Sequence, residues 1–282
     1  MLALRPVTGT IGAVIDGIDL SGKVGVDLAR VLRQALWDHH VLFFREQSLD
    51  IPDLKRVTRV FGALKTIPYI APLLEDPEVI AVEKKATDRN VAVFGGQWHS
   101  DFSFLEHPPA GSLLSAINVP EVGGDTVWAN QTLAFETLPD DLKVIIEGRA
   151  AIHTGKPYGV RFAPLEEERA VNDMVRNDPT ADREIFHPVV RRHPENGLRS
   201  LFVNPIYTSR IEGYSEAESE PILNRLYWHA TQPNFCCRHR WRNGDLVVWD
   251  NRSTLHFAVN DYDGNDRLLY RTTFADGLPP RG

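Results

Sequence analysis

The stretch "DLVVWDNRSTLHFAVNDYDGNDRLLYRTTF", residues 245–274, contains three short apolar runs separated by residues typical of turns. The runs are rich in β-branched and aromatic residues, which favour strands. Similar runs recur from about residue 79 onward, at 79–84, 111–119, 125–130, 187–193, 199–204 and 235–241. Many short strands with a few helices packed outside predict a mainly β fold with flanking helices. Such a fold is a sandwich or a barrel, and a jelly roll is favoured.

Helices are expected at four places in the chain. Residues 26–40 and 48–62 carry apolar side chains at helical spacing, and the second segment begins with capping residues and ends at Gly62. Residues 131–148 and 215–231 are predicted to be helical insertions between strands. Large β domains commonly remain single at a length of 282 residues, so we expect residues 1–282 to form one domain.

The composition is that of an ordinary globular enzyme, with 43% hydrophobic and 24% charged residues. The formal net charge of −7 argues against a general nucleic-acid binder, which would carry a basic patch. No apolar run approaches the length of a membrane span, and the first twenty residues lack the apolar core of a signal peptide. The only two cysteines, Cys236 and Cys237, are neighbours and provide no disulfide framework, so we expect a cytoplasmic protein.

Residues 97–104, "QWHSDFSF", place two polar side chains within a run of apolar and aromatic residues. We predict a half-buried strand here, in which His99 and Asp101 project from the same face. A buried carboxylate without a partner is costly, and a metal ion bound by both side chains would neutralise it. An H-x-D pair alone is weak evidence. Apart from His153, most other histidines lack an acidic partner at ligand spacing and are predicted to be structural.

A third candidate ligand, His256, lies in the strand predicted near residues 254–259. Two histidines and one carboxylate on one face of an octahedral ion leave three positions open, as in non-haem Fe(II) oxygenases. Zinc hydrolases more often use a tetrahedral set. The open positions accept a bidentate oxoacid together with O2, and an arginine is then needed for the far carboxylate of that oxoacid. Arg267 and Arg271, four residues apart on one predicted strand, share a face and are the candidates.

Four motifs in order along the chain carry a resemblance to a known family. They are "WHSDFSF" (98–104), "PEVGGDTVWAN" (120–130), "HPVVRRHPENGLRSLFVN" (187–204) and "GDLVVWDNRSTLHFAVNDY" (244–262), the last followed by two arginines. Together they closely resemble the TauD/TfdA family of Fe(II)/2-oxoglutarate-dependent dioxygenases, from about residue 5 to about residue 275. The resemblance implies a double-stranded β-helix (jelly roll). It also implies an enzyme that uses Fe(II), 2-oxoglutarate and O2 to hydroxylate a C–H bond, with succinate and CO2 as co-products.

The resemblance implies roles for individual residues as well. The iron ligands would be His99, Asp101 and His256. The far carboxylate of 2-oxoglutarate would be held by Thr126 and Arg267. Arg271 matches the position that meets an anionic substrate group, and Trp249 would sit beside the metal.

Two positions depart from the pattern of the taurine-using members. Those members are expected to have a His after the "FG-x-L" turn and an Asn shortly before the W-H-x-D motif. Here Ile67 replaces the His, and Gly95 or Gly96 replaces the Asn, so the ammonium group of taurine would lose its partners. Side chains suited to a larger, apolar pocket are Tyr69, Ile70, Phe94, Phe102, Phe104, Tyr158, Phe162 and Tyr207. We therefore expect a small anionic substrate with an aromatic or alkyl body: an alkyl sulfate or sulfonate, an aryloxyalkanoate or a carboxylated metabolite.

Several alternatives stay open at this point. Residues 155–184 are rich in charge, Gly and Pro, which predicts either a solvated surface loop or a mobile lid over the site. A non-catalytic jelly-roll binding or sensor protein and a zinc hydrolase are the competing functions. The expected partner is the anionic substrate, with no nucleic acid and no membrane, and the sequence leaves a homo-oligomer open.

Overall fold

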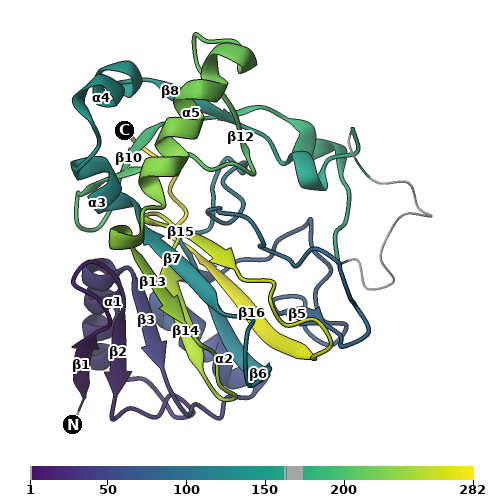
Figure 1. The fold of residues 1–282 in the computed structure, drawn as a ribbon. Helices are drawn as coiled ribbons and strands as arrows, with labels where there is room; N and C mark the ends of the chain where they lie inside the picture. Colours follow the sequence, from purple (N-terminus) through teal and green to yellow (C-terminus); the bar gives the residue numbers. More distant parts are fainter. Residues whose placement is uncertain (1, 162, 164–173) are drawn as a thin grey trace.

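Two packed sheets form the centre of the computed structural model, which describes residues 2–161, 163 and 174–282 (Figure 1). The larger sheet has the order β1 (Ala3–Pro6), β2 (Ala13–Asp16), β3 (Val41–Phe44), β14 (Leu246–Asp250), β6 (Gly111–Asn118), β16 (Arg267–Ala275) and β4 (Ala63–Leu64), with β5 (Ile80–Lys84) also paired to β16. The smaller sheet contains β13 (Cys236–His239), β7 (Thr126–Asn130) and β15 (Thr254–Ala258). Within these sheets only the β2–β3 pair is parallel.

The core between the two sheets explains why the central strands are apolar on both faces. On β14, Val247 and Trp249 belong to the cluster that includes Trp128 of the smaller sheet. The alternate residues Leu246 and Val248 belong to a different cluster, on the opposite face. Because successive side chains of a strand alternate between faces, a strand covered on both sides needs a continuous apolar run. Residues 246–249 of the sequence have that run.

Two helices, α1 (Val26–His39) and α2 (Ile51–Phe61), cover the outer face of the larger sheet. Leu54 of α2 packs in the same cluster as Val248 of β14. The carboxylate of Asp50 caps the first turn of α2, and the helix ends before Gly62, as the sequence predicts. These helices hold the sheet whose inner strands carry Trp249, Arg267 and Arg271.

A second group of helices gathers at the other end of the molecule (Figure 1). It consists of α3 (Gln131–Glu136), α4 (Asp140–Ile146) and α5 (Glu216–Ala230), with the short helix η4 (Pro233–Phe235). They pack with a three-stranded sheet of β12 (Thr208–Ile211), β8 (Ala150–His153) and β9 (Ile185–Pro188), and with the pair β10 (Val190–Arg192) and β11 (Arg199–Leu201). Pro139 separates α3 from α4, where the sequence predicts one helix.

The two-sheet architecture with flanking helices confirms the predicted mainly β fold. Among the described helices, none combines the length and the apolar character that a bilayer span requires. Of the segment 155–184, predicted as a surface loop or lid, residues 162 and 164–173 lie outside the described residues. The described remainder includes η1 (Lys156–Tyr158) and η3 (Pro179–Asp182), and Val175 forms a single β-bridge with Ile70.

Candidate metal centre

The motif "QWHSDFSF" is not a strand, so that prediction is wrong. His99 forms one isolated β-bridge with His256 of β15, in which each backbone N–H donates to the other residue's carbonyl (3.0 and 2.8 Å). Residues 101–104 then form a turn, and Phe102 has a φ of 48°, in the left-handed region that costs a non-glycine residue energy. The chain therefore bends sharply just after Asp101, instead of continuing as a strand.

The bridge and the turn bring three candidate metal ligands together. Asp101 Oδ1 lies 3.6 Å from His99 Nε2 and 3.6 Å from His256 Nε2. One ligand atom from each of these residues lies within 4.8 Å of the others, and all three side chains are buried. The imidazole rings of His99 and His256 have centroids 4.0 Å apart, and the Trp249 ring lies 4.9 Å from that of His256. Trp249 is thus beside the cluster.

The second oxygen of the Asp101 carboxylate is already bonded within the protein. Arg271 Nη2 lies 2.6 Å from Asp101 Oδ2, and Ser112 Oγ donates to the same oxygen (2.8 Å). Burial alone would raise the pKa of the Asp101 carboxyl, but Arg271 and the two histidines outweigh burial and hold this pKa well below its usual value. Asp101 is therefore an anion, with Oδ1 left to face the histidines.

The two histidines are arranged to offer Nε2 to a cation. His99 Nδ1 donates to the carbonyl of Gln97 (2.7 Å), so Nε2 is the ring nitrogen available to a cation. Burial, reinforced by the neighbouring His99, lowers the pKa of His256 well below its usual value, so the ring is neutral. Among the described residues His256 Nδ1 has no hydrogen-bond partner. Two imidazoles and one carboxylate form a donor set that fits Fe(II).

Arg267, at the start of β16, and Thr126, at the start of β7, both lie next to Trp241. Arg267 is buried, its guanidinium carbon lies 5.9 Å from the Trp241 ring and 5.7 Å from the Tyr262 ring, and its Nε has no partner among the described residues. Thr126 Oγ1 accepts a hydrogen bond from Trp241 Nε1 (3.0 Å). A cavity of about 140 Å³ reaches Arg267.

The local backbone at Gly124 is adapted to this arginine. Its φ is 69°, and a Cβ there would lie 3.1 Å from the Arg267 side chain. A glycine before Asp125 therefore allows the close approach as well as the turn.

The predicted aromatic pocket residues form one buried cluster. Its members include Tyr69, Phe102, Phe104, Tyr158 and Tyr207, packed with Ile67 and Ile70. Arg271 joins this cluster to the metal ligands, because its guanidinium carbon lies 5.5 Å from the Phe102 ring. Phe162, another predicted member, lies outside the described residues.

The structure adds polar residues that sequence reasoning missed. Ser112 bridges Arg271 and Asp101, since Arg271 Nη2 donates to Ser112 Oγ (3.0 Å). Asn251 Oδ1 accepts from the backbone N–H of Asp101 (3.3 Å) and from Trp249 Nε1 (3.2 Å). Asn251 lies in the motif that carries Trp249 and His256, and this was the only signal in the sequence that could have found it.

Comparison with known proteins identifies the family. The family model described as "Taurine catabolism dioxygenase TauD, TfdA family" matches residues 3–273. This chain belongs to the TauD/TfdA family. It is 36% identical to an alkylsulfatase of Acinetobacter baylyi over 97% of this chain and 85% of that protein.

A second relative and a solved structure agree with this family. The α-ketoglutarate-dependent 2,4-dichlorophenoxyacetate dioxygenase of Cupriavidus pinatubonensis is 33% identical over 97% of this chain and 98% of that protein. The crystal structure of a taurine dioxygenase from Burkholderia xenovorans superposes with a TM-score of 0.81 at 32% identity, over 99% of this chain and 90% of that one. The predicted fold and the predicted enzyme class, a dioxygenase dependent on Fe(II) and 2-oxoglutarate, are confirmed.

Proposed function

We propose that residues 1–282 act as one dioxygenase domain that hydroxylates a small organic anion, with Fe(II) held by His99, Asp101 and His256. The observation that carries the proposal is that a buried pair of histidines meets a buried carboxylate anion whose Oδ1 faces both. When bound, Fe(II) supplies the redox chemistry by which O2 oxidises both 2-oxoglutarate and the substrate. In the overall reaction 2-oxoglutarate and O2 give succinate and CO2 while one substrate C–H becomes C–OH.

Arg267 is proposed to hold the far carboxylate of 2-oxoglutarate, together with Thr126. A buried guanidinium is strongly disfavoured unless an anion accompanies it. No ion pair involves Arg267 among the described residues, and its Nε is without a partner. A carboxylate in the cavity beside it would supply both the charge and the acceptors. The hydroxyl of Thr126 can donate a further hydrogen bond to a carboxylate oxygen of 2-oxoglutarate, at a lone pair that Arg267 does not occupy.

Arg271 is proposed to meet the acidic group of the primary substrate. Its Nη2 is shared between Asp101 and Ser112, whereas its Nε has no partner among the described residues. Because a guanidinium has five N–H donors in a rigid fork, Arg271 can bind a substrate anion without releasing Asp101. The substrate would then be positioned directly by a residue that also orients a metal ligand.

Taurine is a poor candidate for the substrate. Ile67 is buried in the aromatic cluster and offers no hydrogen bond to an ammonium group. Gly95 has a φ of 80°, and a Cβ there would lie 3.1 Å from Cε1 of His99. An asparagine at this position would crowd the ligand ring. The site therefore lacks the two polar residues expected around taurine's ammonium end.

The aromatic cluster instead favours a substrate with an apolar body. Within it, the hydroxyls of Tyr158 and Tyr207 lie 3.2 Å apart, and both are buried. Two hydroxyls carry two protons, and their mutual hydrogen bond uses one. The remaining O–H suits an acceptor on the substrate body, such as an ether or ester oxygen. Alkyl sulfates or sulfonates, aryloxyalkanoates and carboxylated metabolites with such a body are the proposed substrate classes. If the new hydroxyl is placed beside a heteroatom, the product collapses and the C–O or C–S bond breaks.

Succinate release with Fe(II) and 2-oxoglutarate tests the proposal, across a panel of alkyl sulfates, sulfonates and aryloxyalkanoates of increasing size. We expect substrate-stimulated succinate with Fe(II) and none with Zn(II) or metal-free protein. Activity with Zn(II) and no succinate would indicate a zinc hydrolase. Substrate binding without turnover under any metal would indicate the non-catalytic binding or sensor protein.

We also propose a cytoplasmic location, supported by Cys236 and Cys237 both being free thiols.

Light scattering of the purified protein distinguishes a monomer from a homo-oligomer.

A further inference from the structure

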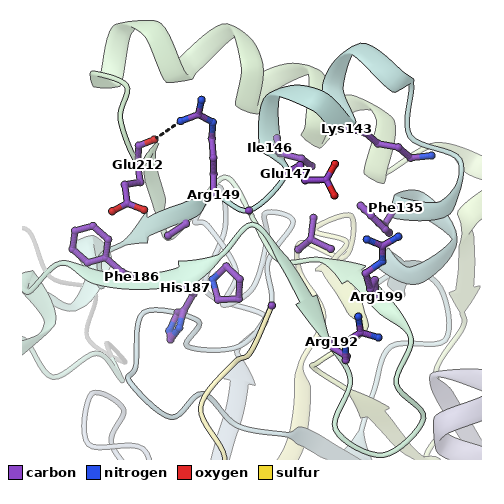
Figure 2. A pocket seen from close by; sticks show the side chains of 15 residues that line it. Phe135, Lys143, Ile146, Glu147, Arg149, Phe186, His187, Arg192, Arg199 and Glu212 are labelled. Atoms are coloured by element: carbon purple, nitrogen blue, oxygen red, sulfur yellow. Dashed lines mark hydrogen bonds between the residues drawn. The ribbon is translucent and has the colours of Figure 1, made fainter.

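A cavity of about 560 Å³ lies away from the metal centre, among α3, α4 and the strands β8 to β11 (Figure 2). None of its lining residues is among those proposed to bind iron, 2-oxoglutarate or the primary substrate. The charged side chains that line it are Lys143, Arg149, Arg192, Arg199, Glu147 and Glu212. Basic groups outnumber acidic ones here, although the whole chain carries a net charge of −7.

Two of these arginines are directly opposed. Arg192 of β10 and Arg199 of β11 are register partners in an antiparallel pair, so their side chains leave the same face of the ribbon. Like charges directly opposite each other destabilise a strand pair. Figure 2 shows both guanidinium groups at one end of the cavity, with Phe135 beside Arg199. An anion between the two arginines would remove the repulsion.

Ion pairs within the described residues do not supply that anion, and the terminal residue Gly282, which also lines the cavity, forms none with either arginine. Neither Arg192 nor Arg199 forms an ion pair within residues 2–161, 163 and 174–282, and the guanidinium of Arg192 donates to the carbonyl of Gly197 (2.9 Å). Asp141, on the helix that borders the cavity, pairs with Arg225 instead. The guanidinium of Arg199 stacks over Phe135 at 4.7 Å, which places its donors beside an apolar surface.

The rest of the cavity offers room for an apolar body. Its floor includes Ile146 and Phe135, both buried, together with Val190. Phe186, with 53% of its surface exposed, lies at the end opposite the two arginines (Figure 2). Ligand pockets are lined mainly by apolar and aromatic side chains, with a few polar groups that orient the ligand.

The wall towards the metal centre is closed by His187. Its ring lies 5.5 Å from the His153 ring, and its Nε2 donates to the carbonyl of Leu105 (2.8 Å). Burial lowers the pKa of the His187 imidazole to about 4, so this wall is neutral at pH 7. The charge of the cavity therefore comes from its Lys, Arg and Glu side chains, none of which is proposed to bind at the metal centre.

We infer that this cavity is a second binding site, for an amphiphilic organic anion whose acidic group lies between Arg192 and Arg199. The apolar body of the ligand lies over Phe135, Ile146 and Val190 and reaches towards Phe186. The inference does not depend on the proposed reaction.

The test is a fluorescence titration of the Fe(II)- and 2-oxoglutarate-loaded protein, without O2, with 8-anilinonaphthalene-1-sulfonate. The double variant Arg192→Gln/Arg199→Gln is expected to raise the Kd by roughly tenfold or more, because charged hydrogen bonds are lost. N-phenyl-1-naphthylamine, which has the same body without the sulfonate, is expected to bind both proteins equally. Arg30→Gln is the matched control, since Arg30 is an exposed arginine on α1 that pairs with Asp27.

Both arginines are exposed, and relief of their repulsion is expected to leave the thermal midpoint of the probe-free double variant equal or higher. An unchanged Kd for the sulfonate in the double variant would overturn the inference. An equally large rise of this Kd in Arg30→Gln would also overturn it. A lowered midpoint of the probe-free variant would also overturn it, because the pair would then be a structural contact.

Discussion

Arg271 Nη2 lies 2.6 Å from Asp101 Oδ2, so the arginine proposed to bind the substrate is bonded to a proposed metal ligand. The contact orients the carboxylate, because Oδ2 is occupied by Arg271 and Ser112 while Oδ1 faces the two histidines. It also keeps the carboxylate ionised without a metal. In the proposed roles, one guanidinium both anchors the substrate and orients a metal ligand.

Removal of any proposed metal ligand is expected to abolish turnover. His99→Ala, His256→Ala and Asp101→Asn should each lose Fe(II) binding and reduce succinate formation by roughly a hundredfold or more, since outer-shell changes alone cost ten- to a hundredfold. Asparagine is chosen at position 101 because its amide oxygen can still accept a hydrogen bond from the buried Arg271, whereas alanine offers no acceptor. Metal content and succinate release are the measurements. His107→Ala, an exposed histidine six residues beyond Asp101, should behave as wild type; near-wild-type activity in a ligand variant would refute the triad.

Arg267→Lys is expected to raise the KM for 2-oxoglutarate roughly ten- to a hundredfold. Lysine keeps the charge but loses the bidentate fork, which costs about 1.5–3 kcal/mol where a charged hydrogen bond is lost. Steady-state kinetics with 2-oxoglutarate varied is the measurement, and Arg240→Lys, at an exposed arginine, is the control. A KM within twofold of wild type would contradict the assignment.

Arg271→Lys is expected to weaken binding of the primary substrate instead. A lysine ammonium can still pair with Asp101, so 2-oxoglutarate decarboxylation in the absence of substrate should be largely retained. The KM of the best substrate from the succinate screen should rise roughly tenfold or more. A change confined to the 2-oxoglutarate KM would remove the main support for an anionic substrate bound at this residue.

Tyr158→Phe is expected to lower the free energy of unfolding by about 1 kcal/mol or more, because it leaves the buried hydroxyl of Tyr207 without a partner. The double variant Tyr158→Phe/Tyr207→Phe should recover part of that loss, since removal of both partners is nearly neutral. In steady-state kinetics, Tyr158→Phe should raise the KM of substrates that have an ether or ester oxygen in the body more than the KM of plain alkyl analogues. Equal effects on both kinds of substrate would argue against recognition by the hydroxyl pair.

The buried His40 is expected to lower the free energy of unfolding in mild acid. Burial lowers the pKa of His40 to about 4, below the usual value of 6.5, so the folded state resists protonation. The resulting stabilisation is complete above pH 6.5 and is lost as the pH falls from 6.5 towards 4, by about 3 kcal/mol. Denaturant unfolding at pH 7, 5.5 and 4.5 measures it. His40→Asn, which tolerates the φ of 65° at this position, should show a smaller pH dependence than wild type or His107→Asn. Equal pH dependence in all three proteins would contradict the prediction.

The strands and the chemistry of the site could be predicted from the sequence because both are encoded locally. Continuous apolar runs such as residues 246–249 specify strands covered on both faces, since side chains alternate along a strand. His99, Asp101 and His256 were found because their chemical types match the demands of one ion. The strand prediction for residues 97–104 was wrong. Their apolar character favoured a strand, but the chain forms one β-bridge and a turn there.

Tertiary structure alone decided which distant residues meet. Asp101 is reached by Ser112 of β6 and Arg271 of β16 because those strands are neighbours in the larger sheet, and sheet order depends on long-range pairing that no local pattern specifies. The opposition of Arg192 and Arg199 likewise follows from the register of β10 and β11. Local periodicity encodes the faces of an element, whereas contacts between elements arise only when the whole core is assembled.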